Sequence, residues 1–285
     1  MKVHIVTNTQ KDKDRSVTEA IVRELLDLGV EVSSDVPSVA DAFQSVNFRE
    51  TAEGIENCDI VLSVGGDGTI LRAAKKASEE EKPILGVNMG KVGFLAEVEP
   101  VEVTLLNRLV DGKYTVDERM MLDCKVVRNG KVCFSCSALN DVVISHGAVS
   151  RTVGIKVDSD VGFISEYSAD GIVFSTPTGS TGYSISAGGP AVDPKMHAII
   201  QTPICAHSLH SRPILFDAGT KLFAEVSVFN GEPYLTADGY ENFRLADGDI
   251  VQVERSKKTT KIIRLKDMSF YEKQTTRKDF GNHQR

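Results

Sequence analysis

Residues 60–69 read Ile-Val-Leu-Ser-Val-Gly-Gly-Asp-Gly-Thr, and no other stretch points to a fold class as clearly. The run from Ile60 to Val64 is almost continuously apolar, which is typical of a strand covered on both faces. A glycine-rich turn follows, and a helical pattern then extends from Ile70 to about Ser78. A buried strand, a tight turn and a helix in this order predict a parallel α/β sheet.

The flanking sequence repeats this alternation. Further strands are predicted at 3–7, 30–32 and 83–87, and apolar residues at helical spacing predict a helix from Val17 to Leu28 that stops at Gly29. We therefore expect a Rossmann-like parallel α/β domain over 1–112, with right-handed crossovers between its strands.

The pattern changes near Gly112. Short apolar segments punctuated by glycine predict a β-rich sandwich domain over 113–265, with strands at 122–127, 132–137, 141–145, 153–157, 171–175, 222–228 and 250–254. The pairs Asn129-Gly130 and Asn230-Gly231 are typical of hairpin turns. A length of 285 residues agrees with two domains, at about 150 residues each.

Composition excludes some partners. With 33 basic and 40 acidic residues the net charge is −7, which argues against a general nucleic-acid or membrane-surface binder. No apolar run approaches the length of a membrane span. Five cysteines at irregular spacing form no disulfide framework and favour a reducing cytoplasm. Cys133 and Cys136 have metal-ligand spacing, but on one strand they would face opposite sides.

The glycine turn is a candidate phosphate site. Gly65, Gly66, Gly68 and Thr69 lie where a parallel strand ends and a helix begins, and helix N-termini bind anions. Asp67 at this point suggests chemistry, either holding a metal or accepting a proton from a hydroxyl. The turn matches neither the P-loop nor the usual dinucleotide fingerprint.

Two further stretches are rich in hydrogen-bonding groups. A strand at 171–175 runs into a loop of hydroxyls and glycines that ends near Pro190, and Tyr183 within it could stack on a planar ring. Ser180 has Thr178 and Gly182 at the flanking positions, so the elbow of a serine hydrolase is absent. Asn140-Asp141 could read the donor and acceptor edges of a base or ribose.

Together these stretches resemble the NAD kinase family, also called ATP–NAD kinases. The resemblance covers most of the chain and rests on residues 65–69, 86–88, 93–95, 140–141, 170–190, 203–209, 212–213 and 238–239. It implies an N-terminal α/β domain, a C-terminal β-rich domain, and a last helix over about 266–285 that returns to the first domain.

The resemblance also implies a reaction. The γ-phosphoryl group of ATP, or in some members of polyphosphate, passes to the 2′-hydroxyl of the adenosine ribose of NAD, with Asp67 as proton acceptor. Gly65, Gly66, Gly68, Thr69 and Asn88 would bind the phosphates of the donor. The NAD site would comprise Asp67, Gly68, Arg72, Phe94, Asn140, Asp141, Arg151, Asp170, Thr178, Thr181, Gly182, Tyr183, Ser184, Ile185, Ser186, Ala206 and Tyr240.

Cofactor and assembly follow from the same resemblance. Few cationic side chains lie near the motifs, so we expect Mg²⁺ or another divalent cation to neutralise the triphosphate, with no dedicated ligand set from side chains. We expect a homodimer or homotetramer in which a neighbouring β domain completes the NAD site.

Two departures and two rivals remain. The family often has Asn-Glu where Asn140-Asp141 stands, and often alanine at Gly182. A lipid or sugar kinase could use the same glycine turn, but it would not explain residues 170–190. A non-catalytic dinucleotide-binding regulator would gain nothing from Asp67.

Overall fold

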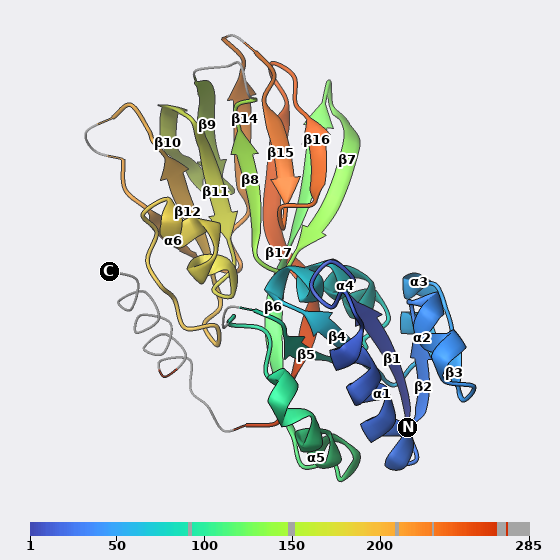
Figure 1. Cartoon of the computed structure of the whole chain (residues 1–285). Coiled ribbons are helices and arrows are strands. Elements are labelled where there is room, and N and C mark those ends of the chain that lie inside the picture. The colour runs from blue at the N-terminus through green and yellow to red at the C-terminus, as the bar shows by residue number, and fades with distance from the viewer. Residues whose placement is uncertain (91–92, 148–151, 209–210, 230, 267–271, 273–285) are drawn as a thin grey trace, which may run out of the picture. The chain divides into compact units, whose positions relative to one another are not determined.

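The computed structural model describes residues 1–285 except 91–92, 148–151, 209–210, 230, 267–271 and 273–285. The chain forms two compact units, drawn with their element labels in Figure 1. The first comprises Met1–Glu118 and Thr260–Arg285, and the second comprises Arg119–Thr259. The helix expected over about 266–285 falls outside the described residues, apart from Lys266 and Glu272.

A parallel sheet organises the first unit, in the strand order β17-β5-β4-β1-β2-β3. Its strands are β1 (Lys2–Thr7), β2 (Glu31–Ser34), β3 (Val46–Phe48), β4 (Ile60–Gly65), β5 (Ile84–Asn88) and the last residues of β17 (Ile250–Arg264). Strands β4 and β5 are buried throughout, as their apolar runs predict. Because β1, β4 and β5 are parallel, their carboxyl ends open on the same edge of the sheet.

Short helices connect these strands. They are α1 (Ser16–Asp27), α2 (Pro37–Ala42), α3 (Thr51–Glu56), α4 (Asp67–Glu79), the 3₁₀ segment η1 (Pro100–Leu105) and α5 (Leu106–Val110). Helix α1 buries Ile21, Val22 and Leu25, and α3 and α4 pack against each other. Sequence periodicity identified α1 and α4 but missed α2, α3 and α5, because five or six residues are too few to display a helical repeat.

Two antiparallel sheets build the second unit. The first contains β6 (Thr115–Arg128), β7 (Lys131–Ala138), β9 (Val153–Ser159), β10 (Gly162–Ala169), β14 (Leu222–Ser227) and β17. The second has the order β13-β12-β11-β8-β15-β16, from β8 (Asp141–Ser145), β11 (Gly171–Ser175), β12 (Ala198–Ile204), β13 (Ile214–Asp217), β15 (Tyr234–Ala237) and β16 (Glu241–Arg244). A 3₁₀ turn, η2 (Gly179–Thr181), and helix α6 (Tyr183–Ser186) follow β11.

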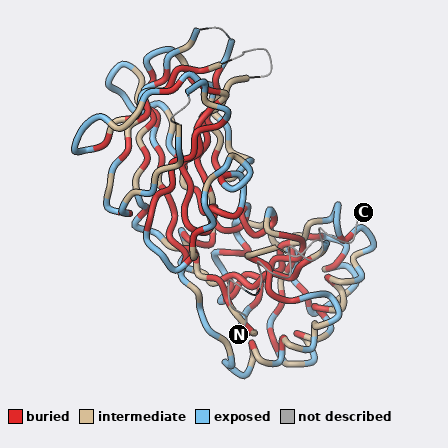
Figure 2. Tube along the Cα trace, turned by 90° about the vertical axis from the view of Figure 1, so that its left-hand side faces the viewer, coloured by how far each residue is buried: buried red, intermediate tan, exposed pale blue. Residues whose placement is uncertain are grey.

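The core of the second unit lies between its two sheets. One buried cluster joins Leu222 and Val251 of the first sheet with Ile144, Phe174 and Leu235 of the second. Figure 2 draws the buried stretches of the chain in red. The predicted α/β domain and the β-rich sandwich are both confirmed.

One predicted hairpin is correct and one is wrong. Asn129 and Gly130 have φ values of 52° and 75° and join β6 to β7, as a two-residue turn with positive φ should. Asn230 lies outside the described residues, but the strands before and after the predicted Asn230-Gly231 hairpin, β14 and β15, lie in different sheets. These two strands do not form a hairpin, because β14 pairs with β9 and β17, whereas β15 pairs with β8 and β16.

Candidate active site

The glycine turn joins the end of β4 to the start of α4. A Cβ on Gly65 would lie 2.9 Å from Cβ of Thr69, so only glycine leaves room for the threonine side chain. The Thr69 hydroxyl accepts a hydrogen bond from the Gly66 N–H at 3.5 Å, and the Gly65 carbonyl accepts one from the N–H of Met89. The turn is thus tied to its own helix and to the segment after β5.

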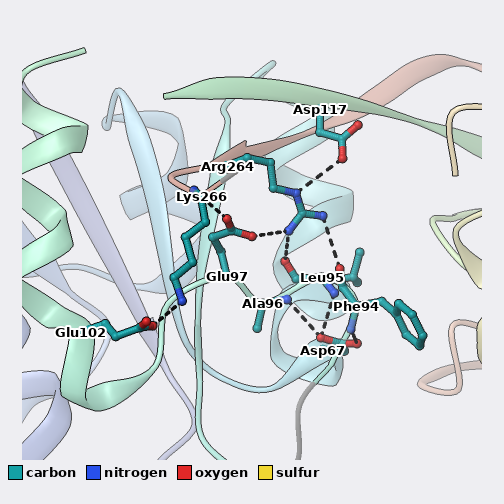
Figure 3. A network of polar contacts seen from close by, with 9 residues as sticks. All are labelled: Asp67, Phe94, Leu95, Ala96, Glu97, Glu102, Asp117, Arg264 and Lys266. Carbon is teal, nitrogen blue, oxygen red and sulfur yellow. Dashed lines mark hydrogen bonds and ion pairs between the residues drawn. The ribbon is translucent and has the colours of Figure 1, made fainter. Parts of the chain in front are cut away.

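Asp67 is the first residue of α4 and is half-buried. Its Oδ2 accepts a hydrogen bond from the N–H of Phe94 at 2.8 Å, and its Oδ1 accepts two from Leu95 and Ala96, both at 3.2 Å (Figure 3). A Cβ on Gly93 would lie 2.5 Å from Cγ of Asp67, so glycine lets this backbone approach the carboxylate.

The three bonds distinguish the two carboxylate oxygens. An ionised carboxylate offers two lone pairs on each oxygen. Two N–H groups occupy those of Oδ1, whereas Phe94 takes one of those of Oδ2. No other donor from the described residues bonds Oδ2, so its remaining lone pair can accept one further proton or hydrogen bond. Asp67 is therefore held in one orientation with a defined basic atom.

Lys11, which belongs to none of the sequence motifs, also lies at this turn. A Cβ on Gly66 would be 2.6 Å from Nζ of Lys11, which belongs to the loop between β1 and α1. That loop is tied to the turn, because the Asn8 N–H donates to the Val64 carbonyl and the Asn8 amide donates to the Thr69 hydroxyl. The sequence could have indicated Lys11, because the loop after a parallel strand β1 must lie at the same sheet edge as the loop after β4.

Asn88 ends β5 beside the turn and pairs with Gly65. Its side chain is 8% exposed, and its Nδ2 donates to the carbonyl of Gly90 at 3.2 Å. Its Oδ1 is buried and has no hydrogen-bond partner within the described part of the chain. A buried polar atom without a partner is rare in proteins, so this oxygen is available to a ligand.

A second group of predicted residues gathers at one end of the second sheet. Asp141 begins β8 and pairs with Ser175 at the end of β11, so the segments around residues 140 and 176 are neighbours. The Asp238 carboxylate accepts hydrogen bonds from the N–H groups of Leu139, Asn140 and Asp141 at 2.8, 2.7 and 3.1 Å. Asp238 thereby fixes the backbone of the Asn-Asp pair.

This end of the sheet contains a cavity of about 350 Å³. It is lined by Asn140, Asp141, Val143, Tyr183, Thr236, Asp238 and Gly239. The volume falls in the range of small-molecule sites. An aromatic ring, an amide and two carboxylates in one concave site could bind a flat polar ring system.

The two carboxylates of the cavity share an unusual environment. Burial, reinforced by the negative charge of Asp238, raises the pKa of Asp141 to about 7. Burial also raises the pKa of Asp238 to about 6, although its three backbone donors oppose the shift. The charged forms are costly because desolvation disfavours them. A ligand that donates hydrogen bonds to Asp141 would therefore favour the ionised carboxylate.

The hydroxyl-rich loop divides into internal and accessible groups. The Thr176 hydroxyl donates to the Leu139 carbonyl at 2.6 Å, and the buried Ser180 hydroxyl donates to the Pro177 carbonyl at 2.7 Å. The buried Ser184 hydroxyl lies 2.9 Å from that of Thr202. Most of these hydroxyls hold the loop in shape, whereas Tyr183 is 46% exposed and lines the cavity.

The other predicted NAD-site residues of the second unit are distributed as follows. Asp170 precedes β11 and so lies at the opposite end of that strand from the Asn-Asp pair, 3.8 Å from His146 Nε2. Thr178 and Thr181 are buried, with hydroxyls bonded to Arg119 and to the Thr178 carbonyl. The rest lie in the turn around Gly182, in α6 (Ile185 exposed, Ser186 bonded to the Gly182 carbonyl), after β12 (Ala206) and after β15 (Tyr240).

Two predicted residues remain. Arg72 is exposed on α4. Burial raises the pKa of the nearby Asp35 carboxyl, and the positive charge of Arg72 opposes part of that rise. Arg151 lies outside the described residues. The predicted NAD-site residues divide between the two units. Asp67, Gly68, Arg72 and Phe94 belong to the first unit, and the other described residues belong to the second.

No metal cage accompanies these sites. Among the described residues, no group of three or more His, Cys, Asp or Glu side chains is placed to hold a metal ion. Cys133 is exposed and Cys136 buried on β7, so the two thiols face opposite sides as expected. None of the helices in the described part of the chain has the length and apolar character needed to cross a membrane.

Comparison with known families decides the assignment. The model of the ATP-NAD kinase N-terminal domain matches residues 3–114, and that of the ATP-NAD kinase C-terminal domain matches residues 139–265. The chain belongs to the NAD kinase family. An NAD kinase of Thermoanaerobacter sp. (strain X514) is 38% identical over 272 residues, which cover 95% of this chain and 96% of that protein. The NAD kinase of Geotalea daltonii is 33% identical and covers 98% and 99%.

Solved NAD kinase-family structures agree. An NAD kinase from Archaeoglobus fulgidus in complex with ATP matches with a TM-score of 0.74 and 26% identity, covering 99% of this chain and 98% of that one. Yeast NADH kinase complexed with NADH shares the fold with a TM-score of 0.87, covering 100% and 89%, at 23% identity. The family and fold expected from the motifs are confirmed, and the chain is a phosphotransferase of this family.

Proposed function

We propose that this chain transfers the γ-phosphoryl group of ATP to the 2′-hydroxyl of the adenosine ribose of NAD, with Asp67 as proton acceptor. The observation that carries this proposal is the remaining lone pair on Asp67 Oδ2, at the end of β4 beside the glycine turn. Membership of the NAD kinase family supports the choice of substrates, and the geometry of the Asp67 carboxylate supports its role as proton acceptor.

In this reaction the ribose oxygen attacks the γ-phosphorus, its proton moves to Oδ2 of Asp67, and the bond between the γ-phosphorus and the bridging oxygen of ADP breaks. Phosphoryl transfer demands positioning and charge stabilisation more than covalent chemistry. Three backbone donors hold the carboxylate before substrate arrives, so little reorganisation is needed at the moment of reaction.

The donor triphosphate would lie over the glycine turn. The N–H groups of Asp67 and Gly68 lie at the start of α4, where backbone N–H groups and the helix dipole favour anions. Lys11 and the buried Oδ1 of Asn88 lie at the same sheet edge, and the carbonyl-type oxygen of Asn88 suits a hydroxyl or a hydrated cation. Asn88 Oδ1 could hold a hydrated Mg²⁺ or another divalent cation, which would neutralise part of the charge of the triphosphate.

The acceptor would occupy the cavity in the second unit. Asn140 and Asp141 would read the adenosine, and Tyr183 would stack on a ring. Thr178, Thr181, Gly182, Ser184, Ile185 and Ser186 would shape the wall, and Asp170, Ala206 and Tyr240 of the same unit would add contacts. Arg72 and Phe94 of the first unit, and Arg151 outside the described residues, stay predicted NAD-site residues.

We also propose a homodimer or homotetramer in the cytoplasm, with a second copy completing the NAD site. Two observations support this. Tyr183 and Ile185 beside the cavity are 46% and 43% exposed, so α6 presents apolar surface that a second copy could cover. All five cysteines are free, which suits a reducing compartment.

One assay tests the proposed function. The purified protein, given NAD, ATP and Mg²⁺, should form NADP, and excess chelator should abolish the product. Turnover of a lipid or a sugar in place of NAD would contradict the proposal. Binding of NAD with no product under these conditions would instead indicate the non-catalytic regulator.

Replacing Lys11 by alanine should raise the KM for ATP by about tenfold and leave the KM for NAD unchanged. A charge-assisted hydrogen bond to phosphate is worth about 1.5–3 kcal/mol, discounted here because the ammonium is exposed. Lys11→Arg should retain most of the affinity. Lys13→Ala, an exposed lysine in the same loop, is the control. An unchanged KM for ATP would remove Lys11 from the donor site.

Replacing Asp141 by alanine should weaken NAD binding by about 1–3 kcal/mol, the cost of leaving a substrate donor unpaired, without changing the KM for ATP. Asp141→Glu, the commoner family residue, should be tolerated. In the wild type the KM for NAD should fall as pH rises through about 7, because NAD binds the ionised carboxylate. Asp141→Asn should remove this dependence.

The melting temperature of Asp141→Ala is the control, and the direction of its change with pH can be stated in advance. The folded pKa of Asp141 is raised to about 7, so its contribution to stability is lost as pH rises from its unfolded pKa to about 7. Removing the carboxyl should therefore not lower the melting temperature at pH 8. A change confined to the ATP dependence would mean that the cavity is not the acceptor site.

A further inference from the structure

The segment that holds Asp67 is itself held from its other side. Arg264, near the end of β17, donates from Nη1 to the carbonyl of Leu95 at 3.0 Å and from Nη2 to the carbonyl of Phe94 at 3.3 Å (Figure 3). Arg264 is separated from Asp67 by almost 200 residues of chain, and both belong to the first unit. The side chain is 11% exposed.

The planarity of the peptide bond gives these contacts their significance. The carbonyl of Phe94 and the N–H of Leu95 belong to one rigid peptide group, and the carbonyl of Leu95 and the N–H of Ala96 belong to the next. Both N–H groups donate to Oδ1 of Asp67. Two peptide groups therefore bridge the guanidinium and the carboxylate, with their dipoles aligned between the positive and the negative charge.

The guanidinium of Arg264 also affects the strength of the hydrogen bonds to Asp67. Hydrogen bonds in a chain polarise one another, so a cation on the carbonyl end strengthens the donor at the N–H end. The guanidinium has five N–H donors in a fixed plane, which allows one side chain to bond two successive carbonyls. A lysine ammonium in its place could not reproduce that fork.

Arg264 is in turn fixed by two carboxylates. Its Nη1 lies 3.0 Å from Glu97, whose side chain is 1% exposed, and its Nε lies 3.4 Å from Asp117. The other oxygen of Glu97 accepts the backbone N–H of Lys266 at 2.9 Å, and the Lys266 ammonium bonds Glu102. The guanidinium therefore reaches the two carbonyls from a rigid setting (Figure 3).

We propose that Arg264 is a positioning residue for phosphoryl transfer. Through the peptide groups of residues 94–96 it orients and strengthens the donors that hold the Asp67 carboxylate, and it touches no substrate. This inference rests on the proposed role of Asp67 as proton acceptor. It assigns the end of β17 a function in catalysis as well as in pairing with β5.

The test compares Arg264→Lys and Arg264→Gln with the wild type in a steady-state assay of NADP formation. Both variants should lower kcat by about 10- to 100-fold, because a displacement of about 1 Å at a reacting group costs up to that factor. The KM values for NAD and ATP should stay within about threefold, since no substrate contact is lost. Arg264→Lys keeps a positive charge beside Glu97 and serves if the glutamine variant fails to fold.

Arg128→Gln is the matched control. Arg128 forms a comparable pair with buried Asp249 in the second unit, with two contacts at 2.8 Å. Its loss should lower the melting temperature but not kcat. If Arg264→Lys folds and keeps kcat within twofold, or if only its KM values change, the proposed role is wrong.

A double variant separates this inference from the proposed function. If Arg264 acts through Asp67, adding Arg264→Lys to Asp67→Asn should lower kcat by less than about threefold more, because the group being positioned is already gone. A full further loss of 10- to 100-fold would show that Arg264 acts elsewhere. Undiminished kcat in Asp67→Asn alone would refute Asp67 as the base, whatever the result for Arg264.

Discussion

Asp67→Asn should lower kcat for NADP formation by about 10²- to 10⁴-fold, the usual cost of losing a general base. An amide has no basic oxygen for the ribose proton. Its NH₂ group would also face the N–H of Phe94, which now donates to Oδ2. The measurement is single-turnover and steady-state kinetics, with NAD affinity determined separately by calorimetric titration.

NAD affinity of Asp67→Asn should stay close to the wild-type value, because the proposed adenosine contacts are made by the second unit. Asp27→Asn is the control, since Asp27 is an exposed aspartate at the end of α1 that also loses one charge. Turnover of Asp67→Asn within about threefold of the wild type would rule out Asp67 as the proton acceptor.

Gly93→Ala should have the second largest effect, with kcat reduced by about 10²-fold. The new Cβ would lie 2.5 Å from Cγ of Asp67, a separation that real Cβ atoms do not adopt. Either the carboxylate or the segment 93–96 must move, and a displacement of about 1 Å at the reacting group costs a factor of this size. Steady-state kinetics with both substrates varied should show the loss in kcat and little change in KM.

Gly219→Ala is the control for this variant. Gly219 lies in an exposed turn of the second unit, where a Cβ meets only the flexible end of Asp217 at 3.0 Å. Combining Gly93→Ala with Asp67→Asn should add little to the loss caused by Asp67→Asn alone. Wild-type kcat in Gly93→Ala would mean that the close approach of this backbone to Asp67 has no part in turnover.

Much of the fold was predictable because its signals are local. The buried strands β4 and β5 appear as unbroken apolar runs, and α1 appears as a helical repeat. Helices of six residues or fewer, such as α2 and α3, carry no such repeat and are visible only in the structure. The Asn230-Gly231 pair misled for a related reason, because a turn signal does not say whether the strands around it share a sheet.

Some residues of the candidate site were recognisable in the sequence, and others only in the structure. The glycine turn, Asp67 and the Asn-Asp pair were found as motifs, since each is a short run of unusual residues. Lys11 was missed because its importance depends on β1 and β4 being parallel neighbours, which brings their loops to one edge. The raised pKa of Asp141 was equally out of reach, because it comes from burial beside Asp238, 97 residues further along the chain.

The sequence by itself determined the two fold classes, the family resemblance and the identity of Asp67. The tertiary structure alone decided what holds Asp67. Its three donors are backbone N–H groups, which almost every residue has and which leave no mark on a sequence. Arg264 reads as an ordinary arginine in a strand until the sheet brings β17 beside β5 and the guanidinium meets the carbonyls of Phe94 and Leu95. Residue types can be read along the chain, but the direction of a peptide dipole is set only when distant segments pack.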